Sequence, residues 1–277
     1  MGGRGSARLF AKRIAAVSGA GVRAACVVVA VASTTAVVQA PAQAAGTCAF
    51  VAHRGGSFGS YTENGLARIQ AAHAASIRQF EVDVRTSASG TAWIMHDATV
   101  DRTVGNATGA VAAKSDAQMQ AMRLRDGEPV PTLQSVIDYA GVNNMDPVLH
   151  VKAMTTTSWN SLVTLVRAYG LQSRVVIMGD ATLLSTARKL APEMATMLLD
   201  YKAISVSRIT NFSGAVVQWK AVTAQNVADI HAAGKLFWTF DSYSTTQWKT
   251  LTKLDVDSNL VNNVSAFMKY QAAGCPV

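Results

Sequence analysis

Short apolar runs recur along residues 50–261, and stretches with a helical pattern separate most of them. Apolar runs of this length between turn-forming residues are typical of buried strands. Nine runs are predicted as strands: residues 50–53, 80–84, 92–96, 148–151, 175–178, 196–199, 215–218, 236–240 and 259–261. Because strands that alternate with helices form parallel sheets with crossover connections, the sequence predicts an α/β fold.

The second and third runs are too close together to be parallel neighbours. Only residues 86–90 separate them, whereas a parallel connection needs a dozen residues or more. The two runs therefore predict an antiparallel hairpin, and a fold about Ser89 places His96 roughly opposite Glu81 or Asp83. The other eight runs predict a (β/α)8 TIM barrel with one extra hairpin strand, and a chain of this size suits such a barrel.

The first 44 residues have the three parts of a secretory signal peptide. Basic residues come first, a mostly apolar run occupies residues 24–38, and Ala-Gln-Ala at residues 42–44 is a small-residue cleavage pattern. A retained membrane anchor is one alternative, although the run is shorter than the roughly 20 residues that span a bilayer. A lipid-anchored Cys26 is a weaker one. We expect a secreted protein without a stable membrane span, whose single mature domain covers residues 45–277.

The basic charge of the whole chain comes largely from this leader. The formal net charge is +8, but residues 1–44 hold five basic residues and no acidic one. The remaining domain has 20 basic and 17 acidic residues. A charge so close to balance does not favour a nucleic-acid partner. We expect a small-molecule substrate and a monomer.

Two cysteines remain in the predicted mature chain, Cys48 and Cys275, one near each end. An exported protein folds in an oxidising compartment, where such a pair favours one disulfide. The bridge requires the two ends of the domain to meet, as they do in a closed barrel. Two unpaired, partly buried thiols are the alternative.

Polar side chains gather at the predicted carboxyl ends of four strands, which is the face where barrel enzymes carry their active sites. The set consists of His53 and Arg54 after the first strand, Glu81 and Asp83 on the second, His96 on the returning hairpin strand, and His150 and Lys152 on the next. Residues two apart on a strand point to the same face, so Glu81 and Asp83, and likewise His150 and Lys152, are expected to face one site.

This set has the parts needed to cleave a phosphodiester. Paired carboxylates bind a hard cation, which neutralises anionic charge. Guanidinium and ammonium groups bind phosphate oxygens. Two imidazoles can divide the proton transfers, because one can accept a proton from the nucleophile while the other gives a proton to the departing alcohol.

In order and spacing, these residues resemble the glycerophosphodiester phosphodiesterase family from residue 50 to about residue 241. The matching motifs are His53-Arg54-Gly55, Glu63-Asn64, Glu81-Val82-Asp83, His96-Asp97, Asp101-Arg102-Thr103, Pro131-Thr132-Leu133, His150-Val151-Lys152 and Trp238-Thr239. No single triplet is specific, but eight in the right order are. The resemblance implies a (β/α) barrel hydrolase that releases an alcohol and leaves glycerol 3-phosphate.

The resemblance also implies a role for each matching position. It assigns His53 and His96 as the acid and base pair, Glu81 and Asp83 as metal ligands, and Arg54 and Lys152 as phosphate contacts. Glu63 is expected beside the site, orienting Arg54 or contacting the glycerol. Trp238, near a predicted strand end, is a candidate for stacking on the substrate. Residues 97–131 correspond to a small insertion above the barrel.

Two positions depart from the family pattern. His150 stands where the family has a third carboxylate ligand, and Asp241 stands where it more often has Asn. Ca²⁺ or Mg²⁺ remains the expected cofactor, held weakly through Glu81 and Asp83; an imidazole ligand also makes Mn²⁺ or Zn²⁺ acceptable. An inactive relative that still binds phosphate is the third alternative.

The sequence alone therefore leaves more than one class of function open, including an enzyme and a non-catalytic binding protein. A secreted metal-dependent phosphodiesterase acting on glycerophosphodiesters is the main expectation. A phospholipase D-like enzyme acting on lysophospholipids or sphingomyelin is an alternative with the same barrel. A non-catalytic phosphoester-binding protein is the other alternative, and His150 is the residue that favours it.

Overall fold

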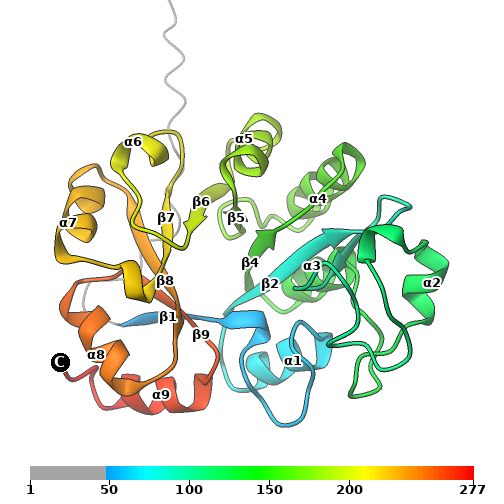
Figure 1. Ribbon diagram of the computed structural model, residues 1–277, viewed down its shortest axis with the longest axis horizontal. Helices are drawn as coiled ribbons and strands as arrows, with labels where there is room; N and C mark the ends of the chain where they lie inside the picture. The colour runs from blue at the N-terminus through cyan, green and yellow to red at the C-terminus, as the bar shows by residue number, and fades with distance from the viewer. Residues whose placement is uncertain (1–47) are drawn as a thin grey trace, which may run out of the picture. The chain divides into compact units, whose positions relative to one another are not determined.

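The computed structural model describes residues 48–277, and the predicted signal peptide lies outside the described residues. Eight parallel strands close into a barrel in the order β1-β9-β8-β7-β6-β5-β4-β2, and a pairing between β1 and β2 completes the ring (Figure 1). The barrel strands are β1 (Ala49–Ala52), β2 (Gln79–Thr86), β4 (Asp146–Val151), β5 (Val176–Gly179), β6 (Ala195–Asp200), β7 (Gly214–Gln218), β8 (Leu236–Ser242) and β9 (Ser258–Val261). The predicted TIM barrel is confirmed.

Strand β3 (Ala92–Ile94) is the extra strand, antiparallel to β2 as predicted. The pairs Val84–Ile94 and Thr86–Ala92 centre the hairpin on Ser89. The backbone N–H of Met95 donates to the carbonyl of Asp83 at 2.9 Å, so the chain continues alongside β2 after β3 ends. This pairing brings His96 to the carboxyl end of the barrel.

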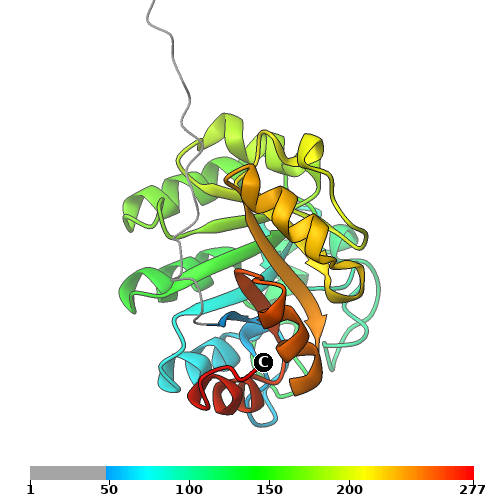
Figure 2. The same cartoon turned by 90° about the vertical axis from the view of Figure 1, so that its left-hand side faces the viewer.

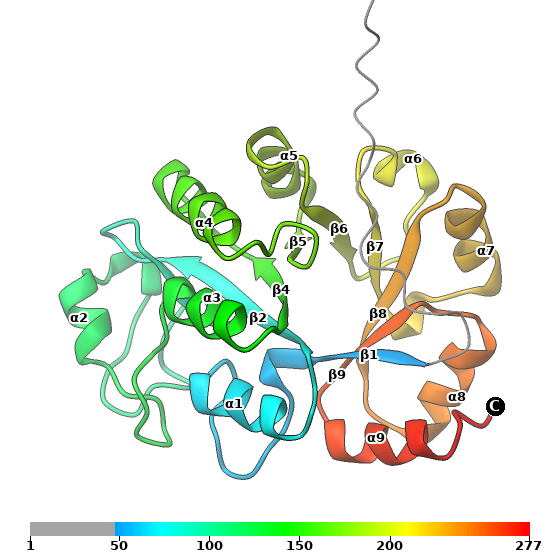
Figure 3. The same cartoon turned by 180° about the vertical axis from the view of Figure 1, so that it is seen from behind.

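Helices cover the outside of the ring, as Figures 1 and 3 show from opposite sides. They are α1 (Leu66–Ala74), α3 (Leu133–Val142), α4 (Thr156–Ala168), α5 (Ala181–Leu190), α6 (Val206–Ile209), α7 (Ala224–Ala232), α8 (Thr245–Lys253) and α9 (Val264–Ala272). Most begin at a side-chain cap, because the first turn has backbone N–H groups without helical partners. The capping residues are Thr132, Thr155, Asp180, Thr223, Ser244 and Asn263.

The apolar core has two layers, as the alternation of side chains along each strand requires. Residues such as Val82, Ile177 and Phe237 point outward and pack under the helices. Residues such as Val148 and Trp238 point inward and fill the barrel. The inner layer ends below the carboxyl ends of the strands, which leaves space there for polar side chains.

The segment from Asp97 to Pro131 forms a small layer of its own beside the hairpin, with α2 (Asp116–Ala121) at the edge of the molecule in Figure 1. Its apolar side chains, including Val100, Met119 and Leu124, form a separate buried cluster with Trp93 and Met95. Part of the predicted insertion thus packs on the hairpin strand that carries His96 toward the barrel.

The two ends of the described chain are joined by a disulfide between Cys48 and Cys275, with Cα atoms 6.2 Å apart. Figure 2 shows the C-terminal helix α9 beside strand β1, and the ring centroids of Phe50 and Phe267 lie 5.1 Å apart. The predicted bridge is therefore present. No helix within residues 48–277 is long and apolar enough to cross a membrane.

Candidate active site

A cavity of about 160 Å³ opens at the carboxyl ends of the barrel strands. Its walls are formed by His53, Arg54, His96, His150, Lys152, Met178, Leu199, Tyr201, Phe240, Asp241 and Leu260. Glu81 and Asp83 lie directly beneath these residues and are completely buried. The structure therefore brings together the two histidines, the two cationic side chains and the three candidate metal ligands predicted from the sequence.

The turn after β1 positions the first part of the site. Arg54, Gly55 and Gly56 have φ angles of 53°, 83° and 77°, and glycine adopts such left-handed backbone readily. A Cβ atom at Gly56 would lie 2.6 Å from Cγ2 of Val264, so this position also needs the missing side chain. The turn aims the backbone N–H of Arg54 at Oε2 of Glu81, 2.8 Å away.

Asn64 fixes the second acidic side chain. Its Nδ2 donates to Oδ2 of Asp83 at 2.9 Å, and the backbone N–H of Asp83 donates to Oδ1 of Asn64 at 3.1 Å. Asn64 adopts a φ of 63°, which Asn tolerates better than most residues. This residue belongs to the Glu63-Asn64 motif, but only the three-dimensional structure shows that it holds Asp83 in place.

Glu81, Asp83 and His150 could hold a metal ion, because one ligand atom of each lies within 4.8 Å of the others. Nδ1 of His150 is 3.1 Å from Oδ1 of Asp83 and 3.8 Å from Oε1 of Glu81. Among residues 48–277, Oε1 of Glu81 finds no hydrogen-bond donor although it is fully buried. A buried carboxylate oxygen without a partner is costly, so two carboxylates and one imidazole here fit a divalent cation.

The charges around this group depend strongly on one another. Burial and the negative charge of Asp83 raise the pKa of Glu81 well above its ordinary value. Burial would raise the pKa of Asp83 too, but the hydrogen bond from His150 and the charge of Lys152 lower it instead. Nζ of Lys152 is 3.3 Å from Oδ1 of Asp83. Asp83 is thus the ionised member of the pair, and added positive charge would also favour ionised Glu81.

His53 is held with a free nitrogen toward the site. Its Nδ1 lies 3.0 Å from Oδ1 of Asn262, which can only accept, so Nδ1 carries the proton. Nε2 then has a free electron pair, 3.7 Å from Oε2 of Glu81. Burial and the nearby charge of Arg54 lower the pKa of His53 to about 4. The imidazole is therefore neutral at neutral pH and can accept a proton.

His96 is held from the insertion side by a chain of charged groups. Its Nδ1 lies 2.6 Å from Oδ1 of Asp97, and Nε of Arg102 donates to Oδ2 of Asp97 at 2.6 Å. Arg102 also donates to Oε1 of Glu63 at 2.6 Å, and that same oxygen accepts from Arg54 at 2.8 Å. Glu63 therefore orients Arg54, one of the two placements expected from the sequence.

Trp238 does not line the cavity. Strand β8 continues to Ser242, so Trp238 is an inward-facing residue within the barrel core and is only 4% exposed. The expectation that it stacks on substrate rested on a strand end placed too early. Tyr201 and Phe240 are the aromatic residues of the cavity wall instead.

The two remaining histidines of the chain, His73 and His231, lie on the outer helices α1 and α7. Nδ1 of His73 is 3.0 Å from the hydroxyl of Tyr139, and Nε2 of His231 is 2.9 Å from Oδ2 of Asp257. Neither residue lines the cavity.

Sequence patterns did not identify Asn262 as the residue that holds the ring of His53. The one feature of the sequence that could have indicated this role is the position of Asn262 directly after the last strand.

Comparisons with known proteins agree with this geometry. The model of the glycerophosphoryl diester phosphodiesterase family matches residues 53–266. No curated protein sequence matches the chain. The fold resembles that of an Oleispira antarctica phosphodiesterase solved in complex with the product sn-glycerol-3-phosphate. The TM-score is 0.73 at 22% identity, covering 80% of this chain and 95% of that one.

Two further solved structures share the fold. A glycerophosphodiester phosphodiesterase from Agrobacterium tumefaciens has a TM-score of 0.69 at 21% identity, covering 80% of this chain and 99% of that one. One from Parabacteroides distasonis has a TM-score of 0.74 at 15% identity, covering 84% and 100%. Since the family model matches most of the sequence, the chain belongs to the glycerophosphoryl diester phosphodiesterase family and is a phosphoric diester hydrolase.

Proposed function

We propose that this protein is a secreted, metal-dependent phosphodiesterase that hydrolyses glycerophosphodiesters to glycerol 3-phosphate and an alcohol. The single observation that carries the proposal is the arrangement around the 160 Å³ cavity. His53 and Arg54 line it from the end of β1, His96 from the segment after β3 and Lys152 from the end of β4, directly above two buried carboxylates. One phosphate group placed in a cavity of this size can meet all four side chains.

The side chains divide the reaction as follows. Arg54 and Lys152 bind the non-bridging phosphate oxygens and offset their charge. His53, neutral and with Nε2 free, takes the proton of the attacking oxygen as the new P–O bond forms. His96 gives a proton to the alcohol oxygen as the old P–O bond breaks. The same two transfers serve whether water attacks directly or a glycerol hydroxyl attacks first.

Neighbouring residues keep the two imidazoles ready for these transfers. Asn262 fixes the ring of His53 through Nδ1, 3.0 Å away. Asp97 fixes the ring of His96 through Nδ1 and complements a positive charge on it. Since the other ring nitrogen is left free in each case, both histidines can act toward the cavity.

Glu81, Asp83 and His150 would hold the metal ion. When bound, the ion would neutralise phosphate charge and orient a phosphate oxygen. The mixed donor set suits Mn²⁺ or Zn²⁺ as well as Ca²⁺ or Mg²⁺, because imidazole is a better ligand for the first two. Lys152 shares Oδ1 of Asp83 with this position, which lowers the negative charge available to a cation.

Export is part of the proposal and rests on the leader pattern of residues 1–44. The disulfide between Cys48 and Cys275 supports it, since such bonds persist in oxidising compartments. Expression of the full chain in a secreting bacterial host tests this directly. Amino-terminal sequencing of the protein from the medium should begin near Ala45, whereas an uncleaved or cell-bound product would contradict export.

The activity is tested by choline release from glycerophosphocholine, with and without a chelator. Ca²⁺, Mg²⁺, Mn²⁺ and Zn²⁺ are each added back to the chelated protein. Release of glycerol 3-phosphate that requires one of these ions supports the proposal. Turnover that is unaffected by chelation would refute metal dependence, and absence of turnover with all four ions would refute the enzymatic assignment.

Two observations favour specific alternatives. Nδ1 of His150 and Nζ of Lys152 already contact Asp83, as expected of a phosphate-binding site that needs no metal. Calorimetric binding of glycerol 3-phosphate without turnover would support that alternative.

The exposed Tyr201 at the cavity mouth could instead meet a lipid chain. Choline release from lysophosphatidylcholine or sphingomyelin, but not from glycerophosphocholine, would support a phospholipase D-like function.

A further inference from the structure

The cavity has two chemically different walls. One wall comes from the ends of β1 and β4 and from the segment after β3, and carries His53, Arg54, His96, His150 and Lys152. The opposite wall comes from the ends of β6 and β8, and carries Tyr201, Phe240 and Asp241 together with aliphatic side chains. A phosphate held at the first wall would extend one of its two ester groups toward the second. The second wall would therefore contact the alcohol part of the substrate and influence which alcohol is accepted.

An irregularity in β8 turns Asp241 into the cavity. Thr239 pairs with Asn259 and Ser242 pairs with Val261, so two residues of β8 stand opposite one residue of β9. Neighbouring residues of a regular strand point to opposite faces, yet Phe240 and Asp241 both line the cavity. This bulge and the φ of 64° at Asp241 re-aim its side chain. The local backbone is thus built to present a carboxylate here.

The hydrogen bonds that hold the carboxylate of Asp241 come from neutral groups of the protein. Its two oxygens accept hydrogen bonds from Nε2 of Gln218 at 3.1 Å and from the hydroxyl of Tyr243 at 2.9 Å, both of which are neutral groups. Among residues 48–277, no lysine, arginine or histidine forms an ion pair with it. Glu63, by contrast, is bound by Arg54 and Arg102. Asp241 thus keeps a negative charge available to a ligand.

Two aromatic rings line the same cavity as this carboxylate, and a third belongs to Tyr243, which contacts it. The rings of Tyr201 and Phe240 pack edge to face with centroids 5.2 Å apart, and Tyr201 is 61% exposed at the mouth. Tyr243 is 55% exposed and holds Asp241 through its hydroxyl. An aromatic face attracts a cation electrostatically, and a carboxylate adds to that attraction. A neutral polyol would gain from neither.

We propose that Tyr201, Phe240 and Asp241 form a subsite for an alcohol that carries an ammonium group, as in the choline or ethanolamine esters of glycerol phosphate. The inference rests on the proposed phosphodiesterase function and names the substrate class within it. A rival explanation is that Asp241 acts only through His53, whose imidazole its charge also reaches. This rival explanation predicts that loss of Asp241 lowers turnover of every substrate equally. The proposed subsite predicts a larger loss for substrates that carry an ammonium group.

The test compares two substrates in each variant. The measured quantity is the ratio of kcat/KM for glycerophosphocholine to kcat/KM for glycerophosphoglycerol, in which the cationic alcohol is replaced by a neutral one. Asp241→Asn keeps the size of the side chain and tolerates the left-handed backbone. The ratio should fall about tenfold in this variant, as expected for the loss of one partly screened opposite charge. An unchanged ratio would overturn the proposal, even if both rates fell.

A matched pair of variants tests the aromatic contribution. Tyr201→Leu removes the ring and should lower the same ratio severalfold, whereas Tyr201→Phe keeps the ring and should retain it. Equal ratios in the two variants would contradict a role for the ring. Repeating the comparison with lysophosphatidylcholine and lysophosphatidylglycerol identifies the source of the ammonium group. The pair that shows the larger preference distinguishes a soluble ester from a lipid headgroup.

Binding measurements keep this test separate from the proposed activity. If the protein turned over none of these substrates, the proposed function would fail, but the subsite could still be measured. Calorimetry would then compare glycerophosphocholine with glycerophosphoglycerol in the unaltered protein and in Asp241→Asn. Tighter binding of the choline ester that disappears in the variant supports the subsite. Equal binding of the two esters by the unaltered protein would overturn it.

Discussion

The cavity and the surroundings of the disulfide are held together by opposite means. Around the cavity, buried ionisable groups position one another, as Asp83, His150 and Lys152 do. Around the Cys48–Cys275 bridge, the rings of Trp248, Phe267 and Tyr270 pack with centroids 4.9 to 5.9 Å apart. The difference indicates that this barrel obtains its chemistry and much of its stability from separate places, which variants can test.

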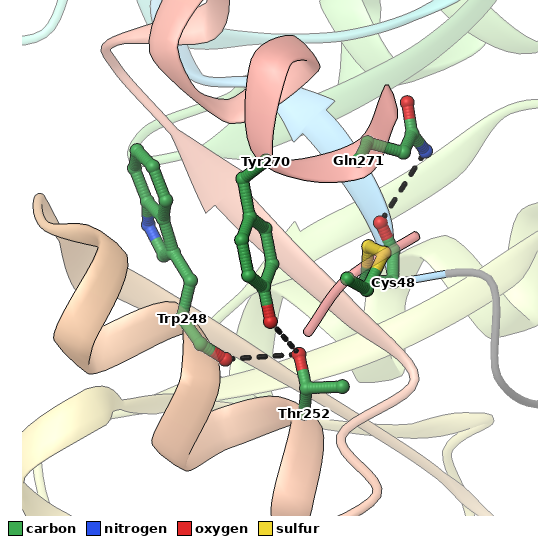
Figure 4. The surroundings of a disulfide bond; sticks show 6 residues. Cys48, Trp248, Thr252, Tyr270 and Gln271 are labelled. Atoms are coloured by element: carbon green, nitrogen blue, oxygen red, sulfur yellow. Dashed lines mark hydrogen bonds between the residues drawn. A yellow bond between two sulfur atoms is a disulfide. The ribbon is translucent and has the colours of Figure 1, made fainter. Parts of the chain in front are cut away.

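The disulfide region is tied by covalent and polar contacts that have no chemical role in our proposal. The hydroxyls of Tyr270 and Thr252 lie 2.9 Å apart, and Thr252 also donates to the carbonyl of Trp248 (Figure 4). Nε2 of Gln271 donates to the carbonyl of Cys48 at 3.4 Å. These contacts join α8, α9 and the start of β1. Changes here should alter the free energy of unfolding and leave turnover intact.

The largest expected effect is on turnover. His53→Ala and His96→Ala should each lower kcat for glycerophosphocholine by about 10²- to 10⁴-fold, because each removes one proton-transfer group. Steady-state kinetics measures the loss, and thermal unfolding checks that the fold persists. His73→Ala is the matched control, since it removes a histidine whose ring contacts Tyr139 on the outside of the barrel. A rate near that of the unaltered protein in either cavity variant would refute the assigned role.

The next effect should appear in stability alone. Replacing both Cys48 and Cys275 by Ser removes a bridge between residues 227 positions apart. The freed unfolded chain gains entropy, so we expect the free energy of unfolding to fall by about 3–5 kcal/mol. Urea unfolding measures the change. Turnover assayed well below the unfolding temperature should stay the same, and a loss of turnover under those conditions would show that the two regions are coupled.

A smaller effect concerns the metal. His150→Glu adds a charged oxygen ligand beside Glu81 and Asp83, and should tighten Ca²⁺ or Mg²⁺ binding about tenfold. Calorimetry measures the affinity in the unaltered protein and in the variant. His73→Glu introduces the same charge on helix α1, away from the cavity, and should have little effect. Unchanged affinity in His150→Glu would mean that this position does not face the metal.

Most of the fold could be predicted because strands and their connections are local features of the sequence. All nine strands appear within a few residues of their expected positions, and the five-residue loop identified the antiparallel pair. The extent of β8 was underestimated, since Asp241 and Ser242 are polar and lie beyond the apolar run. That error placed Trp238 near the cavity, although it belongs to the barrel core.

The site could be predicted less completely, because its contacts join residues far apart in the chain. Spacing places Glu81 and Asp83 on one face, but nothing local indicates that Asn262 holds His53 from 209 residues away. The bulge that turns Asp241 inward depends on how β8 pairs with β9. Sequence patterns thus identify which side chains are present at the site, while strand pairing determines how they point.

The smallest effect lies at the edge of the cavity, where the ion pair between Asp97 and Arg102 belongs to the proposed site and is exposed to solvent. The hydrogen bonds from Arg102 and His96 lower the pKa of Asp97 to about 2, from an ordinary value of 3.8. As pH falls, the unfolded chain takes up this proton first, so the stability that the pair provides is complete above pH 3.8. It is lost as pH falls toward 2.

Arg102→Gln should therefore cost stability at pH 5 and progressively less as the pH is lowered toward 2. The cost should stay below about 1 kcal/mol, because Arg102 is 48% exposed and water screens the pair. Urea unfolding at several pH values measures it. In an Asp97→Asn background the same replacement should show a weaker pH dependence, which comes only from the remaining pair between Arg102 and Glu63, whose pKa Arg102 also lowers. A loss of unfolding free energy comparable to that caused by removing the disulfide would mean that charges at the cavity also stabilise the fold. The cavity and the disulfide region would then not be separate sources of chemistry and stability.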